Sequence, residues 1–575
     1  MTKTIGEIIK ELRTQRKITQ QELAEQIGVT PQAISRWERD VGYPDITQIV
    51  PLAKSLGVST DEILGVSLNN DESLIKEYIE LAAKAADIGN FEKSIEILKE
   101  AEDKFPRSHL IKIKLNNALS SYNSRNTLQA GFGRVNINSM MGIHLRGNGL
   151  IRPLDGVLDD LELVALAVSD GENTALLIAL DNCAMEWECA VEFKKTIHEA
   201  TSIPYDAIYL HAIHTHTAPF LRKTTNEALE KEYFQFVNRK MADVSLLALA
   251  DMKNAKMGFG VGITPEIAFV RRFLMNDGTV RTNPEINDPR VINPIGSADH
   301  RVNVLRFDRE NDASIVLVNY GNHPDVIGGC KLSADWPGAT RREVERIIPN
   351  TKCIFFNGAL GDVNHINIFP KIRGEERMSA SAFGHGYEYS QYMGRSVACT
   401  VAQVFDFAKY REVSSVSFAQ KMITVPTNMP TPEEIPNAYK YLKIYREKGL
   451  TALPGDEMEQ NTIYYESKRM IDFENGPKTM DIQISAVAIG PVVLIGAPGE
   501  SFVDIGKTLK ETQGWDLVLP TSITNGYYAY LPTKEAFDEG GFEARTSEFK
   551  KGVAEIIIEE SKAMLNQLSS KMKKN

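Results

Sequence analysis

The sequence predicts a multidomain protein, in which a small all-α domain and a short helical segment precede a large domain of mixed α/β type. Three patterns predict this order. Apolar residues recur at helical spacing through the first 65 positions, a second helical stretch follows, and strand-like apolar runs alternate with helices from about residue 127. A chain of 575 residues is too long for one hydrophobic core, so we expect two or three domains.

The composition argues against several classes of protein. Charged residues make up 25% of the chain and the formal net charge is -11 at pH 7, which disfavours general coating of nucleic acid or membranes but permits one local DNA-reading surface. No run approaches twenty apolar residues, and the chain opens on an amphipathic helix rather than a signal peptide. We therefore expect a cytoplasmic protein without integral membrane association. Five cysteines without CxxC spacing indicate reduced core thiols.

Helix boundaries are clearest in the first 65 residues. The stretch from Thr19 to Glu22 is a capping box, and Gly28 stands where a tight turn needs a residue without Cβ. Thr30 and Pro31 supply an N-cap and a proline at the first helical position. These signals predict a second helix, a short turn and a third helix that runs from Pro31 to about residue 39.

The third predicted helix carries side chains suited to reading DNA. Gln32, Ser35 and Arg36 share one face, and arginine and glutamine are the side chains that pair with guanine and adenine in the major groove. Ile34 and Trp37 are predicted to pack in the small core instead.

The stretches 19–24, 28–38, 52–53 and 56–58 resemble the Cro/C1-type helix-turn-helix family, also called XRE. The resemblance implies that residues 1–66 form a DNA-binding domain whose third helix enters the major groove. The alternative is a helical domain that has lost DNA binding. Eight Lys/Arg against nine Asp/Glu in residues 1–65 predict weak phosphate attraction, so we expect a dimer on two half-sites. The implied DNA contacts are Gln20, Thr30, Gln32, Ala33, Ser35 and Arg36.

Residues 67–125 resemble one tetratricopeptide-type helical hairpin with a partner helix, after a polar hinge at 69–73. The predicted hairpin turns at 87–90, and the third helix runs from about 108 to 122. One such repeat cannot bury both of its apolar faces. We therefore expect it to pack on a neighbouring domain or on another copy of the chain, which makes a homo-oligomer a reasonable hypothesis. A helical spacer without a partner is the alternative.

In the large region, the pair His214 and His216 follows a predicted strand at 207–213. Side chains two residues apart on a strand project to the same face, so both imidazoles can share one metal ion. The alternative is a polar pair at a strand end. Two further predicted strands, 314–320 and 492–495, end near His323 and Glu500 respectively, and the strand 353–356 ends in a glycine-rich turn. These endings predict a common active-site rim.

The landmarks 131–133, 214–217, 323–324, 334–338, 358–362, 498–500 and 525–530 resemble the neutral/alkaline non-lysosomal ceramidase family. The resemblance assigns residues 127–575 to a ceramidase-like catalytic domain with one zinc ion. The implied ligands are His214, His323, Glu500 and Tyr530. His216 is implied to act on the substrate or the oxyanion, and Arg272, or alternatively Arg271, to bind the reacting group.

One departure from that family bears directly on the chemistry. Asn364 stands where ceramidases carry a serine proposed as a catalytic group; an amide is no nucleophile, but it can donate a hydrogen bond to an oxyanion. Direct attack by metal-activated water is therefore favoured. Tyr530 is expected to be either a labile fourth ligand or an oxyanion donor, because a phenol with a free pKa near 10 must be ionised to bind the metal. The neighbours Tyr527 and Tyr528 leave open which tyrosine takes this place.

The chain ends after one predicted terminal helix at about 547–572, so we expect it to lack the family's C-terminal immunoglobulin-like domain. Access to ceramide in a membrane is then doubtful, and a soluble N-acyl or ester substrate fits better. The preferred function is a sequence-specific transcriptional regulator fused to a zinc-dependent amide or ester hydrolase. The alternative is a regulator whose ceramidase-like domain is a catalytically inactive ligand sensor. The missing serine favours the sensor, whereas the intact ligand set favours the enzyme.

Overall fold

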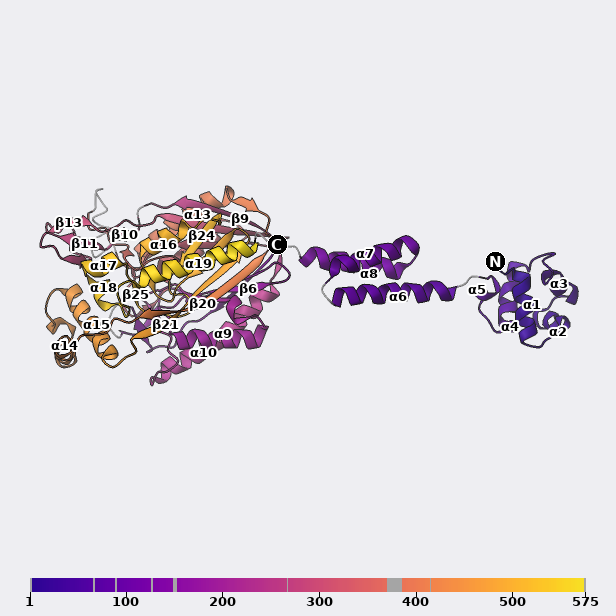
Figure 1. The fold of residues 1–575 in the computed structure, drawn as a ribbon, viewed down its shortest axis with the longest axis horizontal. Coiled ribbons are helices and arrows are strands. Elements are labelled where there is room, and N and C mark those ends of the chain that lie inside the picture. Colours follow the sequence, from indigo (N-terminus) through magenta and orange to yellow (C-terminus); the bar gives the residue numbers. More distant parts are fainter. Residues whose placement is uncertain are drawn as a thin grey trace. The chain divides into compact units, whose positions relative to one another are not determined.

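The computed structural model describes residues 3–65, 68–87, 90–125, 128–147, 152–265, 267–369, 385–413 and 415–572 (Figure 1). The chain divides into two compact units, Met1–Ser124 and Arg125–Asn575. No helix within the described ranges is long and apolar enough to span a bilayer.

The first unit begins with five short helices that surround a small apolar core. They are α1 (Ile5–Gln15), α2 (Gln20–Ile27), α3 (Pro31–Trp37), α4 (Ile46–Leu56) and α5 (Thr60–Ile63). The predicted capping box is present, since Thr19 accepts a hydrogen bond from the backbone of Glu22 and the glutamate returns one. Gly28 takes a left-handed φ of 74°, and Thr30 caps α3. The predicted helix boundaries are therefore confirmed.

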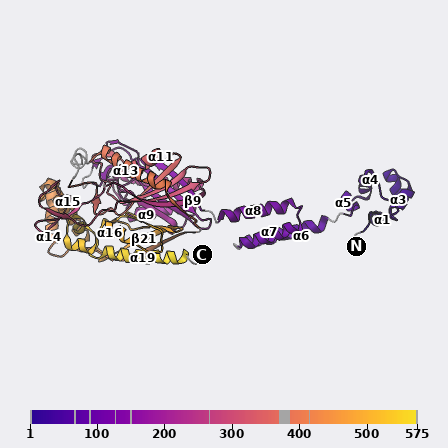
Figure 2. The ribbon, with the colours of Figure 1, turned by 90° about the horizontal axis from the view of Figure 1, so that it is seen from above.

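Three longer helices complete the first unit: α6 (Leu68–Asp87), α7 (Phe91–Lys104) and α8 (His109–Arg125) (Figure 2). Ala82, Ile95, Leu98 and Leu115 form their core. The predicted hinge at 69–73 is wrong, because these residues lie in the first turns of α6. Asparagine, aspartate and serine are favoured at helix starts as well as in turns, so the polar run marked a helix beginning.

The second unit is built on a nine-stranded sheet in the order β17-β15-β14-β9-β1-β5-β6-β7, with β19 also pairing with β9. Its central strands are antiparallel, whereas the pairs β15–β17 and β6–β7 are parallel. The strands are β1 (Gln129–Asn136), β5 (Glu162–Ser169), β6 (Thr174–Leu180), β7 (Ile208–Ala212), β9 (Lys253–Ile263), β14 (Arg301–Arg309), β15 (Ser314–Tyr320), β17 (Thr351–Asn357) and β19 (Lys409–Arg411).

A second sheet, in the order β20-β21-β22-β24, packs on one face of the first. Its strands are β20 (Val416–Pro426), β21 (Thr479–Ile489), β22 (Val492–Gly496) and β24 (Leu517–Thr521). Alternate residues of β5 show the arrangement: Val164 and Leu166 face the second sheet, and Leu163 and Ala165 face the covering helices.

Helices cover both outer faces, which gives four layers. On the nine-stranded sheet lie α9 (Trp187–Thr201), α10 (Ala228–Ala250), α11 (Asp335–Ile347) and α13 (Tyr387–Asp406). On the second sheet lie α16 (Val503–Lys510) and α19 (Val553–Met572). The large mixed α/β domain and its terminal helix were predicted; the pairing of two sheets was not.

Short elements connect these layers. Between β20 and β21 the chain inserts the helical hairpin α14 (Ile435–Lys448) and α15 (Glu457–Phe473). The remaining elements are β2 (His144–Arg146), β3 (Arg152–Pro153), β4 (Gly156–Val157), β8 (Ala218–Pro219), β10 (Phe269–Val270), β11 (Arg272–Met275), β12 (Val280–Thr282), β13 (Val291–Pro294), β16 (Lys331–Leu332), β18 (Val363–Asn364), β23 (Glu500–Ser501), β25 (Tyr530–Leu531), α17 (Lys534–Glu539), α18 (Phe542–Thr546) and the 3-10 turns Tyr205–Ala207 and Leu450–Ala452.

Candidate functional site

Two histidines at strand ends are held by the same kind of contact. Nδ1 of His214 donates to the carbonyl of Cys183 at 2.7 Å, and Nδ1 of His323 donates to the carbonyl of Leu360 at 2.9 Å. Because a carbonyl only accepts, Nδ1 carries a proton in both rings, so Nε2 is the nitrogen that offers a lone pair when the ring is neutral. This is the orientation of a metal-binding imidazole whose other nitrogen is fixed by the protein.

The pair His214 and His216 does not lie on a strand, contrary to the reasoning from strand alternation. Strand β7 ends at Ala212, and His214 has a φ of 74°, in the left-handed region. The chain therefore turns sharply after β7, and this turn brings both rings to one side. Strain of this kind in a residue with a side chain is typical of functional sites.

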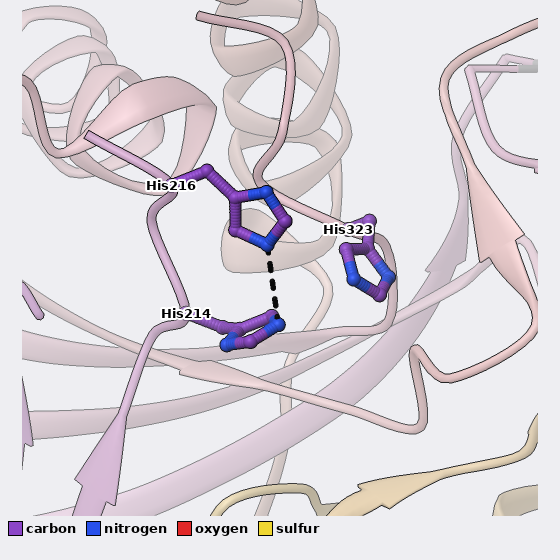
Figure 3. Close-up of side chains that lie close together, drawn as sticks. All are labelled: His214, His216 and His323. Atoms are coloured by element: carbon purple, nitrogen blue, oxygen red, sulfur yellow. Dashed lines mark hydrogen bonds between the residues drawn. The ribbon is translucent and has the colours of Figure 1, made fainter. Parts of the chain in front are cut away.

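Three imidazoles converge at this turn (Figure 3). The Nε2 atoms of His214 and His216 lie 3.3 Å apart, and candidate ligand atoms of His214, His216 and His323 all lie within 4.8 Å of one another. The carboxylate of Glu500 joins them: Oε1 lies 3.5 Å from Nε2 of His214 and Oε2 lies 3.3 Å from Nε2 of His323. The predicted residues His214, His323 and Glu500 therefore meet, although they come from distant parts of the chain.

This donor set fits a zinc ion. Ligand atoms about 2.0 Å from a tetrahedral metal lie about 3.3 Å from one another, close to the separations found here. Nε2 of His323 and Oε2 of Glu500 are buried, and neither makes a hydrogen bond within the described residues. Buried polar atoms normally have a partner, so an ion is the simplest one for both. Imidazole nitrogen and carboxylate oxygen are ordinary zinc ligands.

The charges within the cluster favour one ionic arrangement. Burial opposes charge on His214, but the carboxylate of Glu500 raises the pKa of this ring well above its usual value. Burial likewise opposes charge on Glu500, but His214 and His323 hold the pKa of its carboxyl well below the usual range. Burial, followed by the neighbouring His214 and His323, lowers the pKa of His216. Glu500 is thus an ionised carboxylate between two imidazoles.

Two tyrosines lie beside Glu500. The hydroxyl of Tyr527 donates to Oε1 of Glu500 at 2.8 Å, a contact that the sequence did not reveal. Tyr530 is opposite Glu500 in the short parallel pair β23–β25, and its ring centroid lies 5.4 Å from the guanidinium carbon of Arg271. Burial and the Glu500 carboxylate raise the pKa of Tyr530. Its phenol is therefore a hydrogen-bond donor in this arrangement.

The two adjacent arginines both lie near Glu543, but their other partners differ. Arg271 pairs with Glu543 at 2.7 Å and donates to the carbonyl of Gly361 at 2.7 Å, next to Tyr530. Arg272 pairs with Glu539 at 3.0 Å and donates to the carbonyl of Gly540 at 2.9 Å. Of the two, Arg271 is the one that contacts the tyrosine.

The glycine-rich turn 358–362 packs directly on the backbone of the cluster. A Cβ at Gly361 would come within 2.4 Å of the carbonyl oxygen of Glu500, so only glycine fits. Asn364 follows on β18, where its Nδ2 donates to Asn283 at 3.0 Å and its Oδ1 accepts from the backbone of Ile366 at 3.0 Å. Both ends of this amide are therefore engaged.

The predicted DNA-reading residues form a separate face in the first unit. Gln32 and Arg36 are exposed on α3, and Ala33 and Ser35 are half-buried. Two of the residues that are predicted to contact DNA also make hydrogen bonds within the domain. Gln20 donates to Glu38 at 2.7 Å, and the hydroxyl of Thr30 caps α3.

Comparison with known sequences identifies the N-terminal domain. Residues 9–63 match the helix-turn-helix family model. The transcriptional activator BcrR of Enterococcus faecalis is 41% identical over 59 residues, which are 10% of this chain and 29% of that protein. The regulator YonR of Bacillus subtilis is 34% identical over 82 residues, 13% of this chain and 76% of that protein. The immunity repressor of Bacillus phage phi105 is 35% identical over 74 residues, 13% of this chain and 48% of the repressor. The chain thus spans less than half of the length of BcrR and of the phage repressor.

Comparison with solved structures identifies the fold of the large domain. Neutral ceramidase from Pseudomonas aeruginosa superposes with a TM-score of 0.59 and 16% identity, covering 77% of this chain and 75% of that one. A ceramidase complexed with C2 gives a TM-score of 0.58 and 13% identity, with the same coverages. At these identities the likeness establishes a ceramidase-like fold.

Proposed function

The chain belongs to the helix-turn-helix regulators through its N-terminal domain, and we propose that it is a DNA-binding transcriptional regulator fused to a zinc-dependent hydrolase of amide or ester bonds. One observation carries the hydrolase proposal. Nε2 of His323 and Oε2 of Glu500 are buried without hydrogen bonds, at the separation that two ligands of a tetrahedral ion would have.

We assign the metal to His214, His323 and Glu500, with Tyr530 as a labile fourth ligand or oxyanion donor. Glu500 touches both imidazoles, whereas the short contact of His216 is to His214. When bound, zinc would polarise the scissile carbonyl and lower the pKa of the attacking water. Three protein ligands and one open position are the usual catalytic arrangement.

The neighbouring side chains supply the remaining roles. His216 stands next to the cluster and can take a proton from the attacking water and return it to the leaving nitrogen or oxygen. Tyr530, with Arg271 against its ring, can donate to the oxyanion. We assign the arginine role to Arg271 because its guanidinium lies against the ring of Tyr530, whereas Arg272 pairs with Glu539 and Gly540.

A catalytically inactive ligand sensor is the second candidate, and Asn364 favours it. The family serine is absent, and the amide that replaces it is already bonded at both ends. A sensor would keep the metal and the fold without turnover.

The two functions are separated by a hydrolysis screen. The purified chain, supplied with zinc, is tested on N-acyl amines, N-acyl amino acids and simple esters, with release of free acid as the readout. The enzyme hypothesis predicts turnover that a chelator abolishes and added zinc restores. Metal retention without turnover on every substrate class would favour the sensor.

DNA binding by the N-terminal domain can be tested separately. Replacing Arg36, which is exposed on α3, with alanine should weaken binding to the selected operator by about 1–3 kcal/mol, because a lost base contact costs that much. Binding to random DNA should change little. Fluorescence anisotropy on both duplexes measures this, with the exposed Lys54→Ala on α4 as the control. Equal losses on operator and random DNA would contradict base reading by Arg36.

A further inference from the structure

Both histidines that we assign to the metal follow residues that are held by one buried asparagine. Asn357 is the last residue of strand β17 and is 0% exposed. Its Nδ2 donates to the carbonyl of Ile213 at 3.1 Å and to the carbonyl of Asn322 at 2.9 Å. These two residues directly precede His214 and His323. A single side-chain amide therefore contacts the backbone of both segments that carry the histidine ligands.

The same amide continues the pairing of two strands beyond their ends. Strands β15 and β17 are parallel, and the last paired residues are Tyr320 and Asn357. Oδ1 of Asn357 then accepts from the backbone N–H of Asn322 at 3.2 Å, while Nδ2 donates to the carbonyl of that residue. The side chain thus donates and accepts as a strand backbone would, and it fixes the chain one residue before His323.

The backbone of Asn357 is also bonded to the segment that leads to the other histidine. Its N–H donates to Nε2 of His211 at 2.8 Å, and Nδ1 of that ring lies 2.8 Å from the carbonyl of Ser522. His211 is on strand β7, two residues before Ile213. Asn357 is therefore bonded to this stretch of chain at two points, and it lies between the two segments that carry the ligands.

Only an amide can make the three side-chain bonds from this position. Both partners of Nδ2 are carbonyls, which accept, and the partner of Oδ1 is an N–H, which donates, so the orientation of the amide is determined. A carboxylic acid of the same shape has one O–H and can hold one of the two carbonyls, whereas a carboxylate holds neither. Leucine, which is similar in size, holds none. Replacement should therefore release at least one of the two segments.

We propose that Asn357 is a positioning residue that sets the distance between the two histidine ligands before the metal binds. The proposal rests on the metal site of the proposed hydrolase. A site that is already in place does not pay for ordering its loops when the metal binds, so loss of the amide should weaken metal binding although every ligand remains. Partners that orient ligands in this way typically contribute about 10–100-fold to metal affinity.

Asn319 on β15 is a matched control. It is 1% exposed, its Nδ2 donates to the carbonyls of Phe356 at 3.1 Å and Pro520 at 3.0 Å, and its Oδ1 accepts from Asn303 at 2.9 Å. It thus makes the same types of side-chain bond as Asn357, but none of its partners is next in sequence to a proposed ligand. The same substitution at both positions therefore distinguishes positioning of the site from a general loss of stability.

Titration with zinc in competition with a chromophoric chelator measures the affinity of each full-length variant. Asn357→Asp, which keeps the shape of the side chain, and Asn357→Leu should both bind zinc at least about tenfold more weakly than the wild type. Asn319→Asp and Asn319→Leu should keep the wild-type affinity, even where urea unfolding shows an equal loss of stability. With cobalt in place of zinc, the visible absorption spectrum, which depends on coordination geometry, should change only in the Asn357 variants.

Wild-type zinc affinity with an unchanged cobalt spectrum in both Asn357 variants would overturn the proposal. An equal loss of affinity in the Asn319 variants would also overturn it, because the effect would then belong to the sheet as a whole.

Hydrogen exchange of the metal-free chain tests the positioning role independently of the metal. The backbone N–H groups of Ile213, His214 and His216 all donate hydrogen bonds to other segments. Residues 213–217 should therefore exchange faster in the Asn357 variants than in the wild type or in the Asn319 variants. Unchanged exchange would overturn the proposal. A wild-type chain that binds no zinc but shows this difference would support the role of Asn357 and count against the hydrolase function alone.

Discussion

Replacing His214 with alanine is expected to abolish metal binding and hydrolysis together, whereas His216→Ala should keep the metal and lose turnover. His214 contacts Glu500 and is fixed through Nδ1 by the carbonyl of Cys183, which is how a ligand is held. His216 lies 3.3 Å from His214 and is assigned to proton transfer, a role worth about 10²–10⁴ in rate. Measuring the metal content and kcat of the same preparations distinguishes a metal ligand from a proton-transfer residue.

His198→Ala is the matched control for this pair. This histidine lies on α9, where its Nδ1 bonds the carbonyl of Ile203 and its ring packs on Tyr205, outside the cluster. It should keep both metal and turnover. Loss of metal in His216→Ala as well as in His214→Ala would make His216 a ligand and displace Tyr530 from the proposed set.

Replacing Arg341 with methionine should destabilise the large domain by about 3–5 kcal/mol, the cost of breaking a buried ion pair. Arg341 lies on α11 and is 2% exposed; its Nη1 donates to Asp181 at 2.7 Å and its Nη2 lies 3.2 Å from Glu162. Burial raises the pKa of Asp181 even with Arg341 beside it. Without the guanidinium, Asp181 must be protonated or buried as a lone charge. Urea unfolding followed by circular dichroism measures the loss.

The neighbouring residue supplies the control. Arg342 lies on the same helix but its side chain is 42% exposed, 3.4 Å from Asp159. Exposed ion pairs contribute little, so Arg342→Met should cost less than about 1 kcal/mol. Similar losses in both variants would show that the effect belongs to the helix and not to the buried pair. The double variant with Asp181→Asn should recover part of the loss, because it removes the stranded charge.

Local signals in the sequence were sufficient to predict the helices of the N-terminal domain. The cap at Thr19, Gly28 in its left-handed conformation, and Pro31 at the start of α3 each act within a few residues, so their effect can be read without the rest of the fold. The same kind of signal led to the wrong prediction of a hinge at 69–73, because polar residues that favour turns also favour helix starts.

Only part of the candidate site could be predicted from the sequence. His214, His323 and Glu500 stand at the ends of strands whose apolar runs are visible in sequence, so their convergence could be anticipated. Which side chains meet across the centre depends on sheet order and on sharp turns. The bond between Tyr527 and Glu500 and the choice between Arg271 and Arg272 both arise from such long-range placement.

The metal content of the purified wild-type chain tests the central claim most directly. After incubation with zinc and removal of the excess by gel filtration, mass spectrometry of the metal should find about one zinc per chain, and hydrolysis should rise and fall with that content. Glu500→Gln, which removes the charge between His214 and His323, should hold far less. A wild-type chain that retains no zinc under these conditions would contradict the account.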